Sequence, residues 1–203
     1  MIKAIIFDFG NVICYFTNDI YREKIAKLAG KTAQDIKKII QIDSDVTKRF
    51  ESGYINGQQF YEELSQICGI NVPYDELKTI YSKDKFSRVE GTKELIEKLR
   101  KNYKVSLLSN TSQWDWDYMK QVASEISTFD SITTSFGAKA SKPSPIIFED
   151  ALKKLNLKPE ECVFTDDILE YVEAAKELGF KAIQFTTAKK FEEDLREIGV
   201  EIE

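Results

Sequence analysis

Four sets of polar residues each come shortly after an apolar run that is typical of a β-strand. They are Asp8; Ser109, Asn110 and Thr111; Lys142; and Asp166 with Asp167. Ligands of open α/β sheets bind at the edge formed by the carboxyl ends of the strands, so we expect these side chains to meet there. A carboxylate, a hydroxyl, an ammonium and a carboxylate pair together suit a cation and a phosphoryl group.

The chain of 203 residues contains no histidine. This absence excludes Ser–His and Cys–His nucleophile pairs, histidine general bases and histidine metal ligands. Carboxylates without nitrogen or thiolate ligands favour a hard cation, and Mg²⁺ is the ion we expect. Ser109 and Lys142 would then hold phosphoryl oxygens while Asp8 attacks phosphorus and forms an aspartyl-phosphate. Each residue alone also suits an ordinary turn or helix cap, so the prediction depends on all four sets.

The apolar runs predict five strands, at residues 4–7, 105–108, 131–134, 162–164 and 182–185. The runs are continuous rather than alternating, as in parallel strands that are buried on both faces, and the third is the weakest. Stretches with a helical period lie between them, at residues 91–99, 145–155 and 169–178. Strands that alternate with helices predict a doubly wound α/β fold.

Residues 15–85 separate the first two strands by far more than the roughly 30 residues of a strand–helix–strand unit. This segment is polar and nearly free of strand signals. Helices are expected at residues 20–30 and 58–69, each of which ends at a glycine. We interpret the segment as an inserted helical lobe that acts as a lid, and residues 1–14 and 86–203 as the core.

Composition narrows the partners and the location. A net charge of −5, from 29 basic and 34 acidic residues without a basic block, disfavours nucleic acid or an anionic membrane as partner. Cys14, Cys68 and Cys162 lack paired spacing, which is typical of a reducing cytosol and gives no zinc site. No leader segment and no membrane-spanning apolar stretch occur. We therefore expect a cytoplasmic protein that acts on a small phosphorylated metabolite; its oligomeric state is not predicted.

The four polar sets lie in the segments IIFDFGNVI, LLSNTS, SKPSPIIF and VFTDDILEYVEAAKELG. In this order they resemble the four motifs of the haloacid dehalogenase-like (HAD) hydrolases, most of which are Mg²⁺-dependent phosphatases. The resemblance covers essentially the whole chain. It implies a Rossmann-like core with a five-stranded parallel sheet, and residues 15–85 match the helical cap that follows the first motif in the family.

The resemblance also implies a role for each motif residue. Asp8 would be the nucleophile, and Asp8, the backbone carbonyl of Gly10 and Asp167 would hold Mg²⁺. Asp166 would assist at the metal, and Asp167 is the expected direct ligand of the pair. The phosphoryl group would be bound by Ser109, Asn110 and Lys142.

One position departs from the family pattern. Phosphatases of the family usually carry a second aspartate two residues after the nucleophile, as general acid for the leaving group and base for water. Here that position is Gly10. Glycine keeps the carbonyl oxygen for the metal but lacks the acid–base group, which is commonly worth about 10²–10⁴-fold in rate. A subset that includes a bacterial sugar-phosphate phosphatase is similar in carrying Asp-x-Gly-Asn-Val.

Three functions are considered for a chain with these motifs. The first is a Mg²⁺-dependent phosphatase, for which a sugar phosphate is a candidate substrate and a cap carboxylate or water would replace the missing acid. The alternative is a HAD-fold binding or regulatory module with little or no turnover. A haloacid dehalogenase is disfavoured, because the paired Asp166 and Asp167 indicate a metal that dehalogenases of the family do not use.

Two further groups of residues are candidates for the pocket. The cap offers Asp43, Asp45, Arg49 and Glu51, which more commonly would form a solvated surface. Trp114 and Trp116 would line the pocket or an interface, although packing is the more common role of tryptophan.

Overall fold

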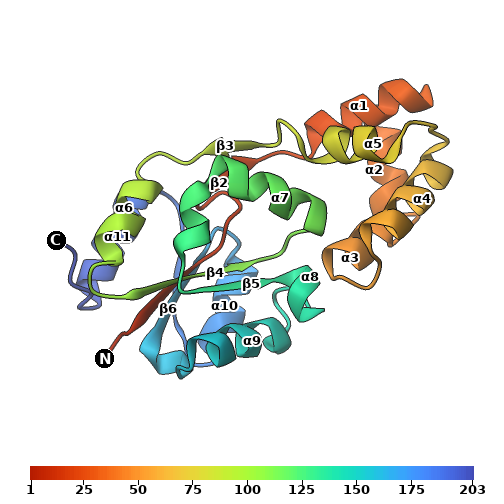
Figure 1. The fold of residues 1–203 in the computed structure, drawn as a ribbon. Helices are drawn as coiled ribbons and strands as arrows, with labels where there is room; N and C mark the ends of the chain where they lie inside the picture. The colour runs from red at the N-terminus through yellow and green to blue at the C-terminus, as the bar shows by residue number, and fades with distance from the viewer.

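The computed structural model describes all residues from Met1 to Glu203. Its main sheet has five parallel strands (Figure 1). In spatial order they are β5 (Ser131–Thr134), β4 (Lys104–Ser109), β1 (Ala4–Phe7), β6 (Cys162–Asp166) and β7 (Lys181–Gln184). The predicted five-stranded α/β fold is confirmed, and the weakest predicted strand is the edge strand β5.

Helices cover both faces of this sheet. One face packs against α6 (Thr92–Leu99), α7 (Gln113–Val122) and α11 (Ala188–Glu197), and the other against α9 (Pro145–Leu155) and α10 (Leu169–Glu177). The central strand β1 shows why its sequence is continuously apolar: Ile5 and Phe7 enter the first core, while Ala4 and Ile6 enter the second. Short helical turns complete the core, at α8 (Ser135–Ala138), Ser124–Thr128 and Pro159–Glu161.

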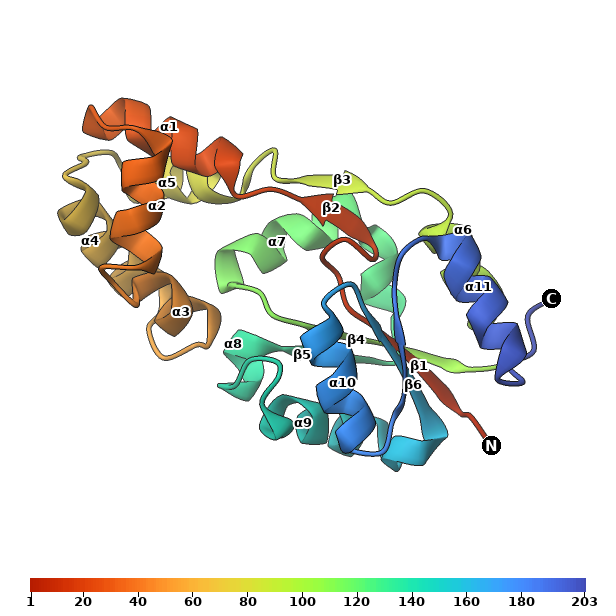
Figure 2. The same ribbon diagram turned by 180° about the vertical axis from the view of Figure 1, so that it is seen from behind.

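The inserted segment forms five helices: α1 (Asp19–Ala29), α2 (Ala33–Gln41), α3 (Val46–Glu51), α4 (Gly57–Cys68) and α5 (Tyr74–Ser82). Figures 1 and 2 show them gathered at one end of the molecule, away from both termini. We call this unit the cap. It has its own hydrophobic core, separate from the two cores of the sheet. None of the helices in the structure is both long enough and apolar enough to cross a membrane.

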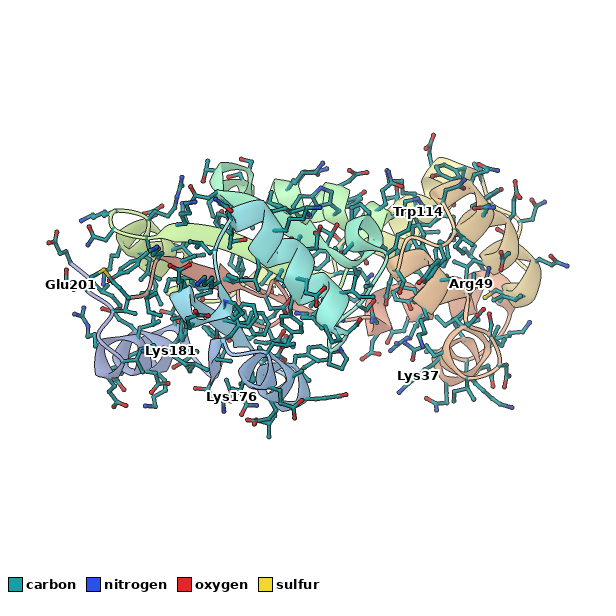
Figure 3. All side chains as sticks on the ribbon, turned by 90° about the horizontal axis from the view of Figure 1, so that it is seen from below. Lys37, Arg49, Trp114, Lys176, Lys181 and Glu201 are labelled. Carbon is teal, nitrogen blue, oxygen red and sulfur yellow. The ribbon has the colours of Figure 1, made fainter.

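Trp114 joins the cap to the sheet domain. Trp114 is a residue of α7 in the sheet domain, yet its indole is buried among the aromatic side chains of the cap core, which include Phe50, Phe60 and Tyr81. The indole N–H donates to the Tyr74 hydroxyl at 3.0 Å. In Figure 3 Trp114 lies at the junction between the cap helices and the core. Neither Trp114 nor Trp116 lines the main cavity described below, so both pack rather than form its wall.

Two short strands connect the cap to the core, and the sequence did not predict them. β2 (Cys14–Phe16) pairs antiparallel with β3 (Phe86–Arg88), and this ribbon is not part of the main sheet. The inserted segment itself is nearly free of strand, as its sequence indicated, because only Tyr15 and Phe16 of β2 fall within residues 15–85. Three-residue strands are too short to show the alternation that marks a strand. β2 crosses the expected border 14/15 and β3 begins directly after the border 85/86, and these borders stay a prediction.

Candidate active site

A cavity of about 300 Å³ opens where the strand ends of the core face the cap. Its wall includes most of the residues that the sequence singled out: Asp8, Gly10, Ser109, Asn110, Lys142 and Asp167. The parallel register explains this, because Phe7 lies opposite both Leu107 of β4 and Thr165 of β6. The residues that follow these three strands therefore emerge side by side.

Lys142 is the buried centre of the arrangement. Its ammonium donates to Asp8 Oδ1 at 2.7 Å, to Asp166 Oδ2 at 2.5 Å and to the carbonyl of Leu108 at 3.2 Å. Burial alone would lower the pKa of Lys142, but the charges of Asp8 and Asp166 outweigh it and raise this pKa above the ordinary value. Lys142 therefore stays protonated and fixes one oxygen of Asp8.

Asn110 holds the backbone of Lys142. Its side-chain N–H donates to the Lys142 carbonyl at 3.1 Å, and its side-chain oxygen accepts from the Lys142 N–H at 2.8 Å. The Asn110 side chain therefore holds the loop of Lys142, and its expected contact with phosphoryl oxygens stays a prediction. The hydroxyl of Ser109, in contrast, makes no hydrogen bond with the protein and faces the cavity.

Asp166 lies behind the cavity wall and is fully buried. Both of its carboxylate oxygens are used, since Oδ2 accepts from Lys142 and Oδ1 accepts from the Ile168 N–H at 2.9 Å. Burial, and after it the charge of Asp8, raise the pKa of Asp166, although Lys142 acts in the opposite direction. Asp166 therefore orients Lys142 within this structure.

The remaining oxygens form a set that suits a hard cation. Carboxylate oxygens of Asp8, Asp166 and Asp167 lie within 4.8 Å of one another. Asp8 Oδ2 and the carbonyl of Gly10 have no hydrogen-bond partner, and Asp167 uses only Oδ2, which accepts from the Asn11 side chain at 2.9 Å. Gly10 and Asp167 thus each offer an unbonded oxygen on the cavity wall that also holds the Asp8 carboxylate, and oxygen ligands of this kind suit Mg²⁺.

Asn11 is a site residue that the sequence did not single out. It has a positive φ of 54°, a conformation that asparagine tolerates better than most residues do. In this turn the side-chain amide of Asn11 donates to Asp167, which follows the neighbouring strand β6. The signal was present in the Gly-Asn pair that follows the nucleophile, because this pair is typical of a turn.

The place of the missing acid is filled by an aromatic ring. A Cβ added to Gly10 would lie 2.9 Å from Cε1 of Phe16 and 3.1 Å from its Cδ1, closer than side chains pack. Phe16 belongs to the unpredicted ribbon strand β2 and lines the same cavity. A side chain at position 10 would therefore require the Phe16 ring, which is 44% exposed, to move.

The side of the cavity that faces the cap carries a second polar group. It is formed by Asn18, Gln41, Glu51, Lys85 and Asp115. Lys85 donates to both carboxylate oxygens of Asp115 at 3.0 Å, and both side chains are buried. Burial, and after it the charge of Asp115, raise the pKa of Glu51 to about 7, although Lys85 acts in the opposite direction.

Of the four cap residues that the sequence offered, only Glu51 reaches this cavity. Asp43 and Asp45 line a neighbouring hollow on the cap surface, which Gln41 and Glu51 also border. Arg49 pairs with Asp45 and Glu63 and lies on the cap in Figure 3. The three cysteines are buried and unpaired, and burial raises the pKa of Cys14 to about 11, which makes it a poor nucleophile.

Comparison with known proteins supports this arrangement of motifs. The sequence model of the haloacid dehalogenase-like hydrolases matches residues 2–179. The D-ribitol-5-phosphate phosphatase of Bacteroides thetaiotaomicron is 31% identical over 191 residues, which are 91% of this chain and 92% of that protein. A sesquiterpene phosphatase of Aspergillus oryzae is 25% identical over 199 residues, which are 97% and 96% of the two chains.

A crystal structure of a family member has the same fold as this chain. A HAD family enzyme from Bacteroides thetaiotaomicron, in complex with magnesium and inorganic phosphate, is similar with a TM-score of 0.81 and 25% identity. The similarity covers 92% of this chain and 96% of that one, cap and core together. With the four motifs at one sheet edge and a family match that spans most of its length, this chain belongs to the haloacid dehalogenase-like hydrolases.

Proposed function

We propose that the protein is a Mg²⁺-dependent phosphatase that hydrolyses a small phosphorylated sugar or polyol through an aspartyl-phosphate on Asp8. One observation carries the proposal most strongly. Lys142 holds Asp8 Oδ1, while Asp8 Oδ2 is unbonded on the wall of a cavity that also carries the free hydroxyl of Ser109. A carboxylate with one fixed and one free oxygen is oriented for nucleophilic attack.

The residues of the core divide the work of this reaction. Asp8 Oδ2 attacks phosphorus, and the Ser109 hydroxyl donates to one phosphoryl oxygen. Lys142 stabilises the negative charge that collects around Asp8 and the phosphoryl group. Asn110 keeps Lys142 in place by binding the Lys142 backbone, and Asp166 does so by accepting from the Lys142 ammonium.

The metal would be held by Asp8, Asp167 and the carbonyl of Gly10, with Asp166 behind them. When bound, Mg²⁺ neutralises charge on the carboxylate and the phosphoryl oxygens, which lowers the repulsion between two anions. This proposal agrees with the magnesium and phosphate found in the similar structure from Bacteroides thetaiotaomicron.

The size and polarity of the cavity support a small hydrophilic leaving group. About 300 Å³ is at the lower end of the range for ligand pockets. The amide side chains of Asn18 and Gln41 on the cap-facing wall suit hydroxyl groups. The relative with 31% identity is named for D-ribitol 5-phosphate, a molecule of this class. A cytoplasmic location, as the sequence predicts, is part of the proposal.

The proposal is tested by phosphate release from p-nitrophenyl phosphate and from a panel of sugar and polyol phosphates that includes D-ribitol 5-phosphate. We expect turnover with Mg²⁺, none with a chelator, and a loss of about 10⁴-fold or more in Asp8→Asn. Asp43→Asn is the matched control, since this exposed carboxylate lies outside the cavity. Equal rates for the wild type and Asp8→Asn would contradict the assignment of the nucleophile.

Metal binding has a readout that does not need turnover. Mg²⁺ that binds the folded state raises the thermal midpoint, and we expect this shift in the wild type but not in Asp167→Asn. If the wild type binds Mg²⁺ and releases no phosphate from any compound, the protein is a binding module. Hydrolysis of 2-chloropropionate without phosphatase activity would instead support the dehalogenase.

A further inference from the structure

Glu51 stands out among the residues that the proposed chemistry leaves unused. It is the last residue of α3, and its half-buried side chain lines the same cavity as Asp8 and Ser109. Its carboxylate makes no hydrogen bond and no ion pair with the protein. Most other acidic groups around this cavity are paired, because Asp115 binds Lys85 and Asp8 binds Lys142. Glu51 therefore offers a carboxyl group to whatever occupies the cavity.

The backbone of Glu51 is fixed to the core. The Ser135 hydroxyl lies 2.6 Å from the Glu51 carbonyl oxygen and accepts from the Thr111 N–H at 2.9 Å. Thr111 belongs to the loop of the second motif, which carries Ser109. One hydroxyl therefore ties the end of α3 to the loop that faces the phosphoryl group.

The residues after Glu51 dock on the core as well. The hydroxyls of Ser52 and Ser141 are 3.1 Å apart. Gly53 has a positive φ of 68°, and a Cβ on it would lie 2.2 Å from the carbonyl oxygen of Phe136. The contact is therefore close enough to require glycine. These contacts hold the end of α3 against the core, with Glu51 on the cavity wall.

The surroundings of Glu51 allow its carboxyl group to gain and lose a proton near neutrality. Its pKa is raised to about 7 by burial and by Asp115. The titratable groups that interact with its charge come from α1, α5, α7 and the segment before β3, and they are Tyr21, Tyr81, Asp115 and Lys85. A group with a pKa near the working pH serves both as acid and as base.

We propose that Glu51 is the general acid and general base of the reaction, supplied by the cap in place of the side chain that Gly10 lacks. This inference rests on the proposed phosphatase function. It assigns the missing role to a residue on a different domain from the nucleophile, so the complete set of reacting groups exists only while the cap is docked.

The first half-reaction then balances as follows. Asp8 Oδ2 forms a bond to phosphorus, and the bond between phosphorus and the ester oxygen breaks with its electron pair on that oxygen. The protonated Glu51 carboxyl gives its proton to this oxygen, so an alcohol leaves and Glu51 becomes a carboxylate.

In the second half-reaction the Glu51 carboxylate takes a proton from water as the water oxygen bonds to phosphorus. The bond between phosphorus and Asp8 breaks, and its electron pair returns to the Asp8 carboxylate. Inorganic phosphate leaves, Glu51 is protonated again, and the sum is one ester plus water giving one alcohol plus phosphate.

The experiment compares two leaving groups in the full-length protein with Mg²⁺. D-ribitol 5-phosphate needs protonation of its alkoxide, whereas p-nitrophenyl phosphate releases a stable anion. We expect Glu51→Gln to slow release of the leaving group in a single turnover by about 10²-fold or more on the first and by less than about threefold on the second. The later hydrolysis of the aspartyl-phosphate should slow equally with both esters, because this step is common to them. Glu51→Asp should recover part of the rate, and Asp8→Asn should lose both activities.

The pH profile is the second readout. Protonated Glu51 is required for the first step, so with the alkyl ester the wild-type rate should fall as the pH rises through about 7. The profile of Glu51→Gln should lack this fall, and so should the wild-type profile with p-nitrophenyl phosphate. A purely structural role of Glu51 would not alter the shape of the profile.

The outcomes separate this inference from the function on which it rests. If the folded wild type hydrolyses neither ester, the proposed phosphatase is wrong. If it hydrolyses both and Glu51→Gln slows leaving-group release in a single turnover equally for both esters or for neither, only the role of Glu51 is wrong. Hydrolysis of the aryl ester but of no sugar or polyol phosphate in the panel would also overturn that role, because no acid would then be at work. Thermal melting of each variant shows whether it is folded.

Discussion

Two buried lysines line the site, and the protein holds them in different ways. Lys142 donates to Asp8, Asp166 and the carbonyl of Leu108, which all come from the ends of three neighbouring strands. Lys85 donates to Asp115 of α7, and its ammonium lies 4.1 Å from the ring centre of Tyr81 and 4.9 Å from that of Tyr21. One lysine is held by the edge of a sheet, and the other by the contact between cap and core.

This difference explains which half of the site can be recognised in a sequence. The partners of Lys142 are set by the register of parallel strands, so each follows an apolar run at a short, readable distance. The partners of Lys85 meet only after α1 and α5 of the cap have packed on α7. No spacing along the chain reports that contact.

The largest effects should come from removing each lysine in turn. Lys142→Met leaves Asp8 and Asp166 as neighbouring buried charges, so we expect the free energy of unfolding to fall by about 3–5 kcal/mol. Turnover should fall by about 10³-fold or more, because the charge beside the phosphoryl group is gone. Urea unfolding and phosphate release measure the two effects.

Lys85→Met is the matched variant. It leaves the Asp115 carboxylate without its ion-pair partner, so the free energy of unfolding should fall by a similar amount. It should nevertheless keep measurable turnover on p-nitrophenyl phosphate. If Lys85→Met loses as much turnover as Lys142→Met does, the proposed difference in role between the two lysines is wrong.

A smaller effect should follow from blocking the docking of the cap. Gly53→Ala places a Cβ against the Phe136 carbonyl, so the end of α3 must move away from the core. We expect turnover of the alkyl ester to fall by about 10- to 10²-fold, since misplacement of about an ångström is enough for this.

The control for this variant is Gly69→Ala at the end of α4. Gly69 has nearly the same φ, 70° against 68°, but no atom lies within 4 Å of its added Cβ. Both variants carry the strain of a left-handed residue, about 1–2 kcal/mol. Only Gly53→Ala should change the rate, and an equal loss in Gly69→Ala would point to strain alone.

The smallest effect should come from restoring a carboxylate at position 10. Gly10→Asp alone should gain little, because the Phe16 ring occupies the space of its side chain. Gly10→Asp combined with Phe16→Ala, in the Glu51→Gln background, should raise turnover of D-ribitol 5-phosphate by about tenfold. Phe16→Ala in the same background is the control, and a similar gain there would show that access to the cavity, rather than the new acid, is responsible.

The core was predictable from the sequence because its signals are local. Continuous apolar runs identified the five strands, and the ends of these strands identified Asp8, Ser109, Lys142 and Asp167 on the cavity wall. The side-chain role of Asn110 was not predictable, since it depends on where the loop of Lys142 crosses the end of β4. The sequence therefore locates a residue at the site more readily than it assigns the partner of its side chain.

Most residues on the cap-facing side of the cavity could not be predicted from the sequence in this way. Phe16 lies in a strand too short to show a pattern, and Lys85 and Asp115 pair across 30 positions of chain. Glu51 was a candidate only as one of four charged residues near a helix end. The structure separates it from Asp43, Asp45 and Arg49, because only its side chain reaches the cavity that contains Asp8.

The contact between Gly10 and Phe16 couples any substitutions made at these two positions. An aspartate at position 10 and an aromatic ring at position 16 compete for one volume, so the benefit of either depends on the other. Changing Gly10 first introduces a clash, and changing Phe16 first uncovers the cavity without adding an acid. We expect strong epistasis between these two positions, with neither order giving a gain at the first step. A protein whose proton donor lies on the cap would thus tend to keep both residues together.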